Sequence, residues 1–150
     1  MKKLILGLFL ILGTISFAAP KFVDMTKVKN AGYVIKNERE DILTMATSDD
    51  DSAIIISFST INMSSKEISD LLKSNALRDS GNFIATLDNN RAYINEFEAQ
   101  GFYSYMIVPK KEKVKNQHTY ATYVSSKKLS KNDLSKITNA ILDEAESYIK

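Results

Sequence analysis

The chain has 150 residues, of which 44% are hydrophobic and 25% are charged, and it contains no cysteine. The absence of cysteine excludes disulfides, thiolate zinc sites, thiol nucleophiles and a cysteine-linked lipid anchor. The formal net charge of +2 is too small to hold the chain on nucleic acid, so we expect no nucleic-acid partner.

Residues 1–18 have the three parts of an export signal. Lys2 and Lys3 form its basic start, residues 4–12 are almost purely apolar, and small residues precede a cleavage point after Ala18. The apolar stretch is too short to span a bilayer comfortably, so we expect a cleaved signal, with an uncleaved anchor as the alternative. We therefore expect an exported product, periplasmic or secreted, that is not an integral membrane protein.

Residues 19–150 have the length of a single domain, and we expect residues 19–30 to be loosely ordered. Short runs rich in β-branched and aromatic residues then predict strands over 33–36, 42–47 and 53–60. The third run begins with apolar residues on both faces, which predicts a strand in the interior of a sheet.

The pattern then changes to the period of a helix. Ser64 and Glu67 form a capping box, and apolar residues follow at Ile68, Leu71 and Leu72, which predicts a helix over 65–77. Four further runs rich in β-branched and aromatic residues follow, separated by polar turns. These runs predict strands over 83–87, 91–97, 101–108 and 118–125.

The last segment is the most amphipathic part of the chain. Ser130 and Asp133 cap a predicted helix over 131–149, whose apolar stripe includes Ile141 and Leu142. Hairpin-length connections join most of the strands. The sequence therefore predicts an α+β fold, with a largely antiparallel sheet of about six to seven strands packed against the two helices.

This order of elements resembles the PsbP/DcrB-like group of small exported α+β proteins. Gly32-Tyr33-Val34-Ile35 is similar to the opening strand of that group, residues 53–59 to its third strand and 64–77 to its intervening helix. The predicted hairpins together with residues 130–150 are similar to its closing half. The resemblance implies an antiparallel sheet between helices and an accessory or binding role. It implies no catalytic residue set.

Two features bear on metal and catalytic chemistry. His118 is the only histidine, which excludes a multi-histidine metal site, and no Gly-x-Ser-x-Gly elbow accompanies it, so we interpret it as an exposed strand-end residue. Residues 49–51 are three consecutive aspartates, which we interpret as a solvated turn, with weak ion binding as the alternative. We expect no metal, no cofactor and no catalytic residue.

Glu96 and Glu98 lie two residues apart and hence on one face of a predicted strand. A pair of carboxylates on one face is the arrangement that a glycosidase uses. Their polar neighbours favour the solvent end of a hairpin instead. A secreted hydrolase that depends on these carboxylates stays an alternative.

Tyrosines and lysines are the candidate binding residues. Tyr103 and Tyr105 share a face of one predicted strand, Tyr120 is expected on the same face of the next strand, and Tyr123 on the other face. Tyrosines mark binding surfaces, although a covering helix also buries them. The lysine-rich loop includes Lys110, Lys111 and Lys113, and it is interpreted as a solubilising loop or as a polyanion-binding one.

These observations favour an exported, non-catalytic accessory or binding domain of the cell envelope. Its partner would be an envelope or surface protein or a small ligand. Two alternatives stay open, namely the secreted hydrolase and a secreted surface module that binds a polyanion through the lysine-rich loop.

Overall fold

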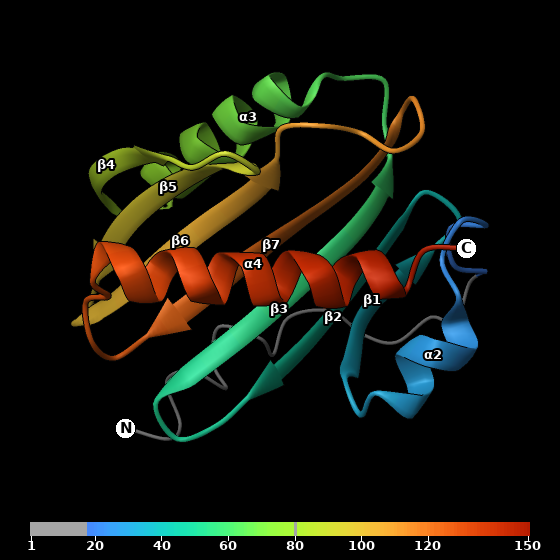
Figure 1. Cartoon of the computed structure of the whole chain (residues 1–150), viewed down its shortest axis with the longest axis horizontal. Coiled ribbons are helices and arrows are strands. Elements are labelled where there is room, and N and C mark those ends of the chain that lie inside the picture. The colour runs from blue at the N-terminus through green and yellow to red at the C-terminus, as the bar shows by residue number, and fades with distance from the viewer. Residues whose placement is uncertain (1–17, 80) are drawn as a thin grey trace.

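The computed structural model describes residues 18–79 and 81–150, so the predicted signal, apart from Ala18, lies outside the described residues. Figure 1 shows one sheet with helices packed against it. The elements are α2 (Met25–Asn30), β1 (Val34–Arg39), β2 (Ile42–Ser48), β3 (Ser52–Thr60), α3 (Ser65–Arg78), β4 (Asn82–Asp88), β5 (Ala92–Ala99), β6 (Phe102–Pro109), β7 (Gln117–Ser125) and α4 (Lys131–Ser147).

The sheet has seven strands in the order β1-β2-β3-β7-β6-β5-β4, and every neighbouring pair is antiparallel. After β3 the chain passes through α3 to the far edge, where β4, β5 and β6 return strand by strand. The last strand, β7, lies between β6 and β3 and completes the sheet. The predicted α+β class, antiparallel sheet and two helices are confirmed, and β3 lies in the interior as predicted.

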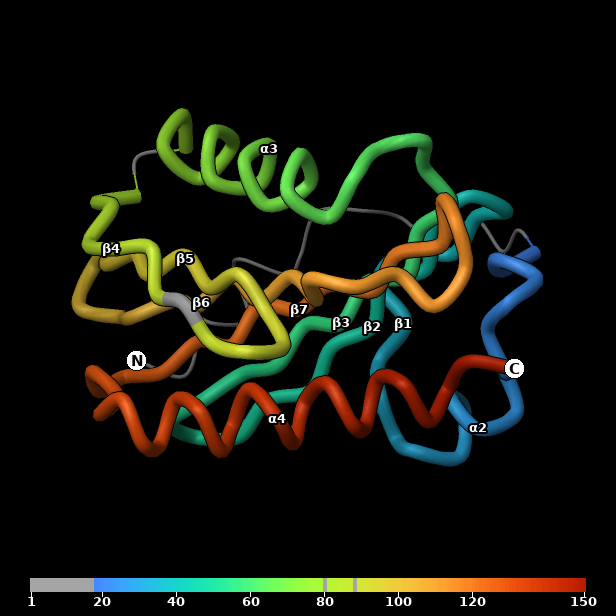
Figure 2. Tube along the Cα trace, turned by 45° about the horizontal axis from the view of Figure 1, so that its top comes forward, coloured from blue at the N-terminus to red at the C-terminus, as the bar shows by residue number. Residues whose placement is uncertain are grey.

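The two long helices lie on opposite faces of the sheet (Figure 2). On the α4 face the strands contribute Leu43, Ile56, Phe58 and Ile107, all with no exposed surface. Helix α4 contributes Leu134, Ile141, Leu142 and Ala145 to the same core. No helix of the described part of the chain is long and apolar enough to cross a membrane.

The start of the domain differs from the prediction of a loosely ordered segment. Val23 forms a bridge with Ile149, and both Val23 and Val28 are buried in the core. Asp24 caps α2 by accepting hydrogen bonds from two backbone N–H groups of the first turn. The helix has only six residues, too few for a visible apolar period, which is why the sequence did not reveal it.

A carboxylate on α4 ties the two ends of the domain together. Glu144 Oε1 accepts hydrogen bonds from the Tyr33 hydroxyl at 2.9 Å and from the Tyr148 hydroxyl at 2.8 Å. Burial, and then the hydrogen bond to Glu144, raises the pKa of Tyr148 to about 12. The same causes raise the pKa of Tyr33 even further. Both phenols are therefore held in their neutral, donating form.

The hydrogen bonds of Tyr33 and Tyr148 to Glu144 predict how the free energy of unfolding depends on pH. Because the pKa of Tyr148 rises from 10 in the unfolded chain to about 12 in the folded one, its contribution is complete below pH 10 and is lost as the pH rises toward 12. Tyr148→Phe should lower the free energy of unfolding at pH 7 by roughly 1.5–3 kcal/mol. Urea titrations should also show a smaller loss between pH 10 and 12 than in the wild type. Parallel pH profiles would contradict this assignment.

The α4 stripe supplies a second prediction. Ile141 is buried against the sheet, whereas its neighbour Ala140 is exposed. Ile141→Asp should abolish folding, because it places an unpaired charge in an apolar core. Ala140→Asp adds the same charge to the same helix and should cost only about 0.5–1 kcal/mol, chiefly in helix propensity. Thermal melts followed by circular dichroism measure both, and similar melting of the two variants would refute the assigned stripe.

Candidate functional site

A concave site lies where α3 leaves the sheet only partly covered. This site, which we call the α3 groove, has a volume of about 270 Å³ and is formed by α3 on one side and by β1, β2, β3 and β7 below it. It is lined by Arg39, Asp41, Ile42, Ser59, Thr60, Ile61, Ile68, Leu71, Leu72 and Tyr120.

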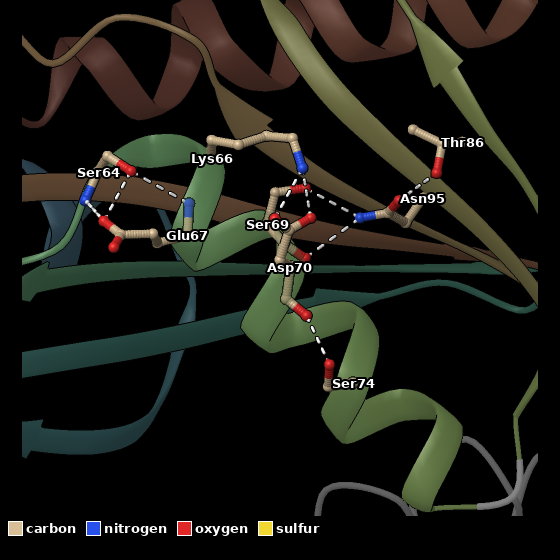
Figure 3. Close-up of polar contacts among 8 residues, drawn as sticks. All are labelled: Ser64, Lys66, Glu67, Ser69, Asp70, Ser74, Thr86 and Asn95. Atoms are coloured by element: carbon tan, nitrogen blue, oxygen red, sulfur yellow. Dashed lines mark hydrogen bonds and ion pairs between the residues drawn. The ribbon is translucent and has the colours of Figure 1, made fainter.

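The position of α3 is set by polar groups at its start and middle (Figure 3). Ser64 and Glu67 form the predicted capping box, with Glu67 N–H donating to Ser64 Oγ and Ser64 N–H donating to Glu67 Oε2. Further along, the buried Asn95 amide of β5 donates to Ser69 Oγ at 3.0 Å and to the Ser69 carbonyl at 3.3 Å. The Thr86 hydroxyl donates to the Asn95 carbonyl oxygen, so the amide is satisfied at both ends.

This anchoring turns the helix away from the orientation that its apolar stripe predicts. The side buried against the sheet contains Ser65, Ile68 and Ser69, while Leu71 is 44% exposed. Ile61, which follows β3, is also 36% exposed. Two large apolar side chains thus remain accessible on the walls of the groove.

The floor of the groove contains hydroxyl groups. Tyr120 on β7 and Ser57 on β3 are directly paired, and Ser59 follows on the same face. Burial raises the pKa of Tyr120, against a smaller lowering by the nearby hydroxyls of Ser59 and Ser57. The buried Ser59 Oγ itself has no hydrogen-bond partner among the described residues. A ligand could satisfy this group.

A charged pair lies at the rim. Arg39, the last residue of β1, is paired across a tight turn with Ile42, the first residue of β2. Its Nε lies 3.3 Å from Asp41 Oδ1, and the side chains are 56% and 64% exposed. Such exposed pairs contribute little to stability, so the guanidinium can change partners at low cost.

His118 is not the exposed residue that we predicted from its position. It is 4% exposed and lines a cavity of about 40 Å³, together with Glu112 and residues of the loop before β7. Its Nε2 lies 3.8 Å from Glu112 Oε1 and has no hydrogen-bond partner within the described ranges. The cavity suits a guest the size of a water molecule and is too small for an organic substrate.

The carboxylate pair also differs from its interpretation. Glu96 is buried rather than at the solvent end of a hairpin, and its Oε1 lies 3.7 Å from Lys128 Nζ. Glu98, on the same face, accepts a hydrogen bond from the backbone N–H of Gly101. Neither carboxylate lines the α3 groove.

The structure separates the three candidate tyrosines. Tyr105 pairs with Tyr123, so these two and Tyr103 share the α4 face, contrary to the predicted placement of Tyr123. Tyr105 is fully buried, and its hydroxyl accepts a hydrogen bond from the Leu129 N–H at 2.8 Å. Tyr103 packs partly buried against the same core. Tyr120 lies on the opposite face, and it alone of the three lines the groove.

The structure brings Lys111 and Lys113 together at the small cavity beside His118 and separates Lys110 from them. Lys110 Nζ lies 5.5 Å from the centre of the Tyr93 ring, which places it toward the α3 face. Lys113 Nζ lies 3.2 Å from Glu146 Oε2 on α4, toward the other face. Lys111 lines the small cavity beside His118.

Most of the groove residues were not singled out from the sequence as candidates. Ile68, Leu71 and Leu72 were predicted only as the apolar residues of a helix, and Arg39 lay between two predicted strands. The available signal was Ser65 and Ser69, one helical turn apart, which indicate a second, polar stripe on the same helix. Tyr120 was a candidate from the sequence, but the pairing of β3 with β7 that brings it next to Ser59 is a long-range property without a local signal.

Comparisons with known proteins identified no related protein. No protein-family model matches the chain, and neither the curated proteins nor the solved structures give a significant match. The resemblance to PsbP/DcrB-like proteins therefore stays a prediction.

Proposed function

We propose that the protein is an exported, non-catalytic binding domain of the cell envelope, and that the α3 groove binds a small ligand with an apolar body. The observation that supports this proposal is the combination found in the groove. Exposed Leu71 and Ile61 offer apolar contact, and the buried Ser59 hydroxyl offers an unused hydrogen bond. Apolar walls with a few fixed polar groups are typical of small-molecule sites.

The other two functions gain less support from the geometry. A carboxylate-dependent hydrolase needs an accessible acid in a substrate-sized pocket, but Glu96 is buried beside Lys128 and away from the groove. A polyanion-binding loop needs a surface with excess positive charge, but Lys111 and Lys113 share their cavity with Glu112 and Glu146, and Lys110 is directed elsewhere. An accessory binding role also agrees with the family resemblance.

Export can be tested by mass spectrometry of the recovered protein. The basic start, the apolar run and the small residue Ala18 predict that the protein recovered from the envelope or medium begins at Ala19. Ala18→Asp should block cleavage, because the enzyme that removes signals requires a small residue there, and the cells should then retain the full-length mass. A wild-type product that still begins at Met1 would contradict the proposed export.

Binding in the groove can be tested with a neutral fluorescent probe, N-phenyl-1-naphthylamine, which brightens in apolar surroundings. Titration of the wild-type protein should give a saturable rise in fluorescence. Leu71→Asp should weaken binding at least tenfold, because it places a charge on the apolar wall. Both Leu71 and Leu77 are exposed on α3, but Leu77 lies outside the groove, so Leu77→Asp is the matched control.

Both variants should melt close to the wild type, since neither leucine is buried. Loss of binding in Leu71→Asp alone would support the site. A wild-type protein without saturable binding, or equal binding by the two variants, would refute it.

A further inference from the structure

We infer that the ligand of the α3 groove is a free aliphatic monocarboxylate, with its carboxylate bound by Arg39 and its chain along the wall formed by α3. This inference rests on the proposed function and names the chemistry of its ligand. It follows from three features of the groove, namely the guanidinium at the rim, the carboxylate beside it and the apolar volume within.

Arg39 has unused hydrogen-bonding capacity. Its recorded contact within the described part of the chain is the one between Nε and Asp41 Oδ1, which leaves the two terminal amino groups. These groups form a planar fork that matches the two oxygens of a carboxylate. The side chain is 56% exposed, so it is accessible from solvent at the mouth of the groove.

Asp41 determines which anion is accepted. Its carboxylate lies next to Arg39, so the rim has one positive and one negative charge. A single negative charge on the ligand can share the guanidinium with Asp41, whereas a doubly charged phosphate would be repelled by it. A cationic head group would be repelled by the Arg39 guanidinium, which lies beside Asp41. The rim therefore favours a monoanion.

The apolar part of the groove determines the rest of the ligand. Ile42, Ile61, Leu71 and Leu72 line part of a groove whose whole volume is about 270 Å³, close to the lower end of small-molecule sites. An aliphatic chain of medium length fits such a volume and can follow the apolar wall of α3, whereas a peptide would bring several backbone amides that each need a partner. The floor offers few polar partners to such amides, among them the Ser59 and Tyr120 hydroxyls. We therefore commit to a free acid.

The test is displacement of N-phenyl-1-naphthylamine from the full mature chain by decanoate and by decanol. The two competitors have the same chain length and differ in charge, so the ratio of their Kd values isolates the head group. In the wild type, decanoate should bind at least tenfold more tightly than decanol, and the ratio should fall as salt is added. In Arg39→Gln the ratio should fall to about one.

Arg78→Gln is the matched control, because Arg78 is a second exposed arginine, at the end of α3, and lies outside the groove. It should keep the wild-type ratio. N-acetyl-trileucine, whose carboxylate belongs to a peptide, is the third competitor and should bind more weakly than decanoate.

The outcomes separate the two proposals. If the neutral probe does not bind, the proposed function fails. If the probe binds but decanoate and decanol compete equally, or if Arg39→Gln keeps the wild-type ratio, the binding function stands and the carboxylate inference is overturned. Tighter binding of the tripeptide than of decanoate would replace the free acid by a peptide end.

Discussion

The hydrogen bonds between Asn95 and Ser69 set the relation between the sheet and α3, and the groove depends on them. A buried amide without partners would cost several kcal/mol, so the helix must present a polar residue to β5. Presenting Ser69 brings Ser65 and Ile68 to the sheet and turns Leu71 outward. A helix packed by its apolar stripe alone would bury Leu71 and leave little of the groove.

The two faces of the sheet therefore differ in what they contribute, one to the hydrophobic core and the other to the groove. The face under α4 contributes most of the hydrophobic core, with the buried Glu96 as a polar exception. The face under α3 contains apolar residues together with buried polar ones, namely the hydroxyls of Ser57 and Ser59 and the amide of Asn95. Because α4 and its face supply the stability, the opposite face can retain unpaired polar groups and exposed leucines. Such an asymmetry suits a domain that binds a ligand on one side.

The local parts of this fold could be predicted from the sequence, and the long-range parts could not. Period-two runs and capping boxes depend on neighbouring residues, so the strands, α3 and α4 were found near their observed bounds. The insertion of β7 between β3 and β6 depends on pairing across the whole chain. For the same reason the faces within one strand were predicted correctly, as with Tyr103 and Tyr105, while the face of Tyr120 relative to them was wrong.

The rim pair explains how such a groove can be selective without being strongly charged. In the free protein Arg39 is paired with Asp41 in solvent, where an ion pair contributes about 0–1 kcal/mol. Exchanging or sharing that partner with a ligand carboxylate therefore costs little, and most of the affinity comes from burial of the chain, at about 25 cal/mol for each Å² of apolar surface. The charge then decides which chains are accepted, because a carboxylate gains the fork of Arg39 and a neutral head group does not.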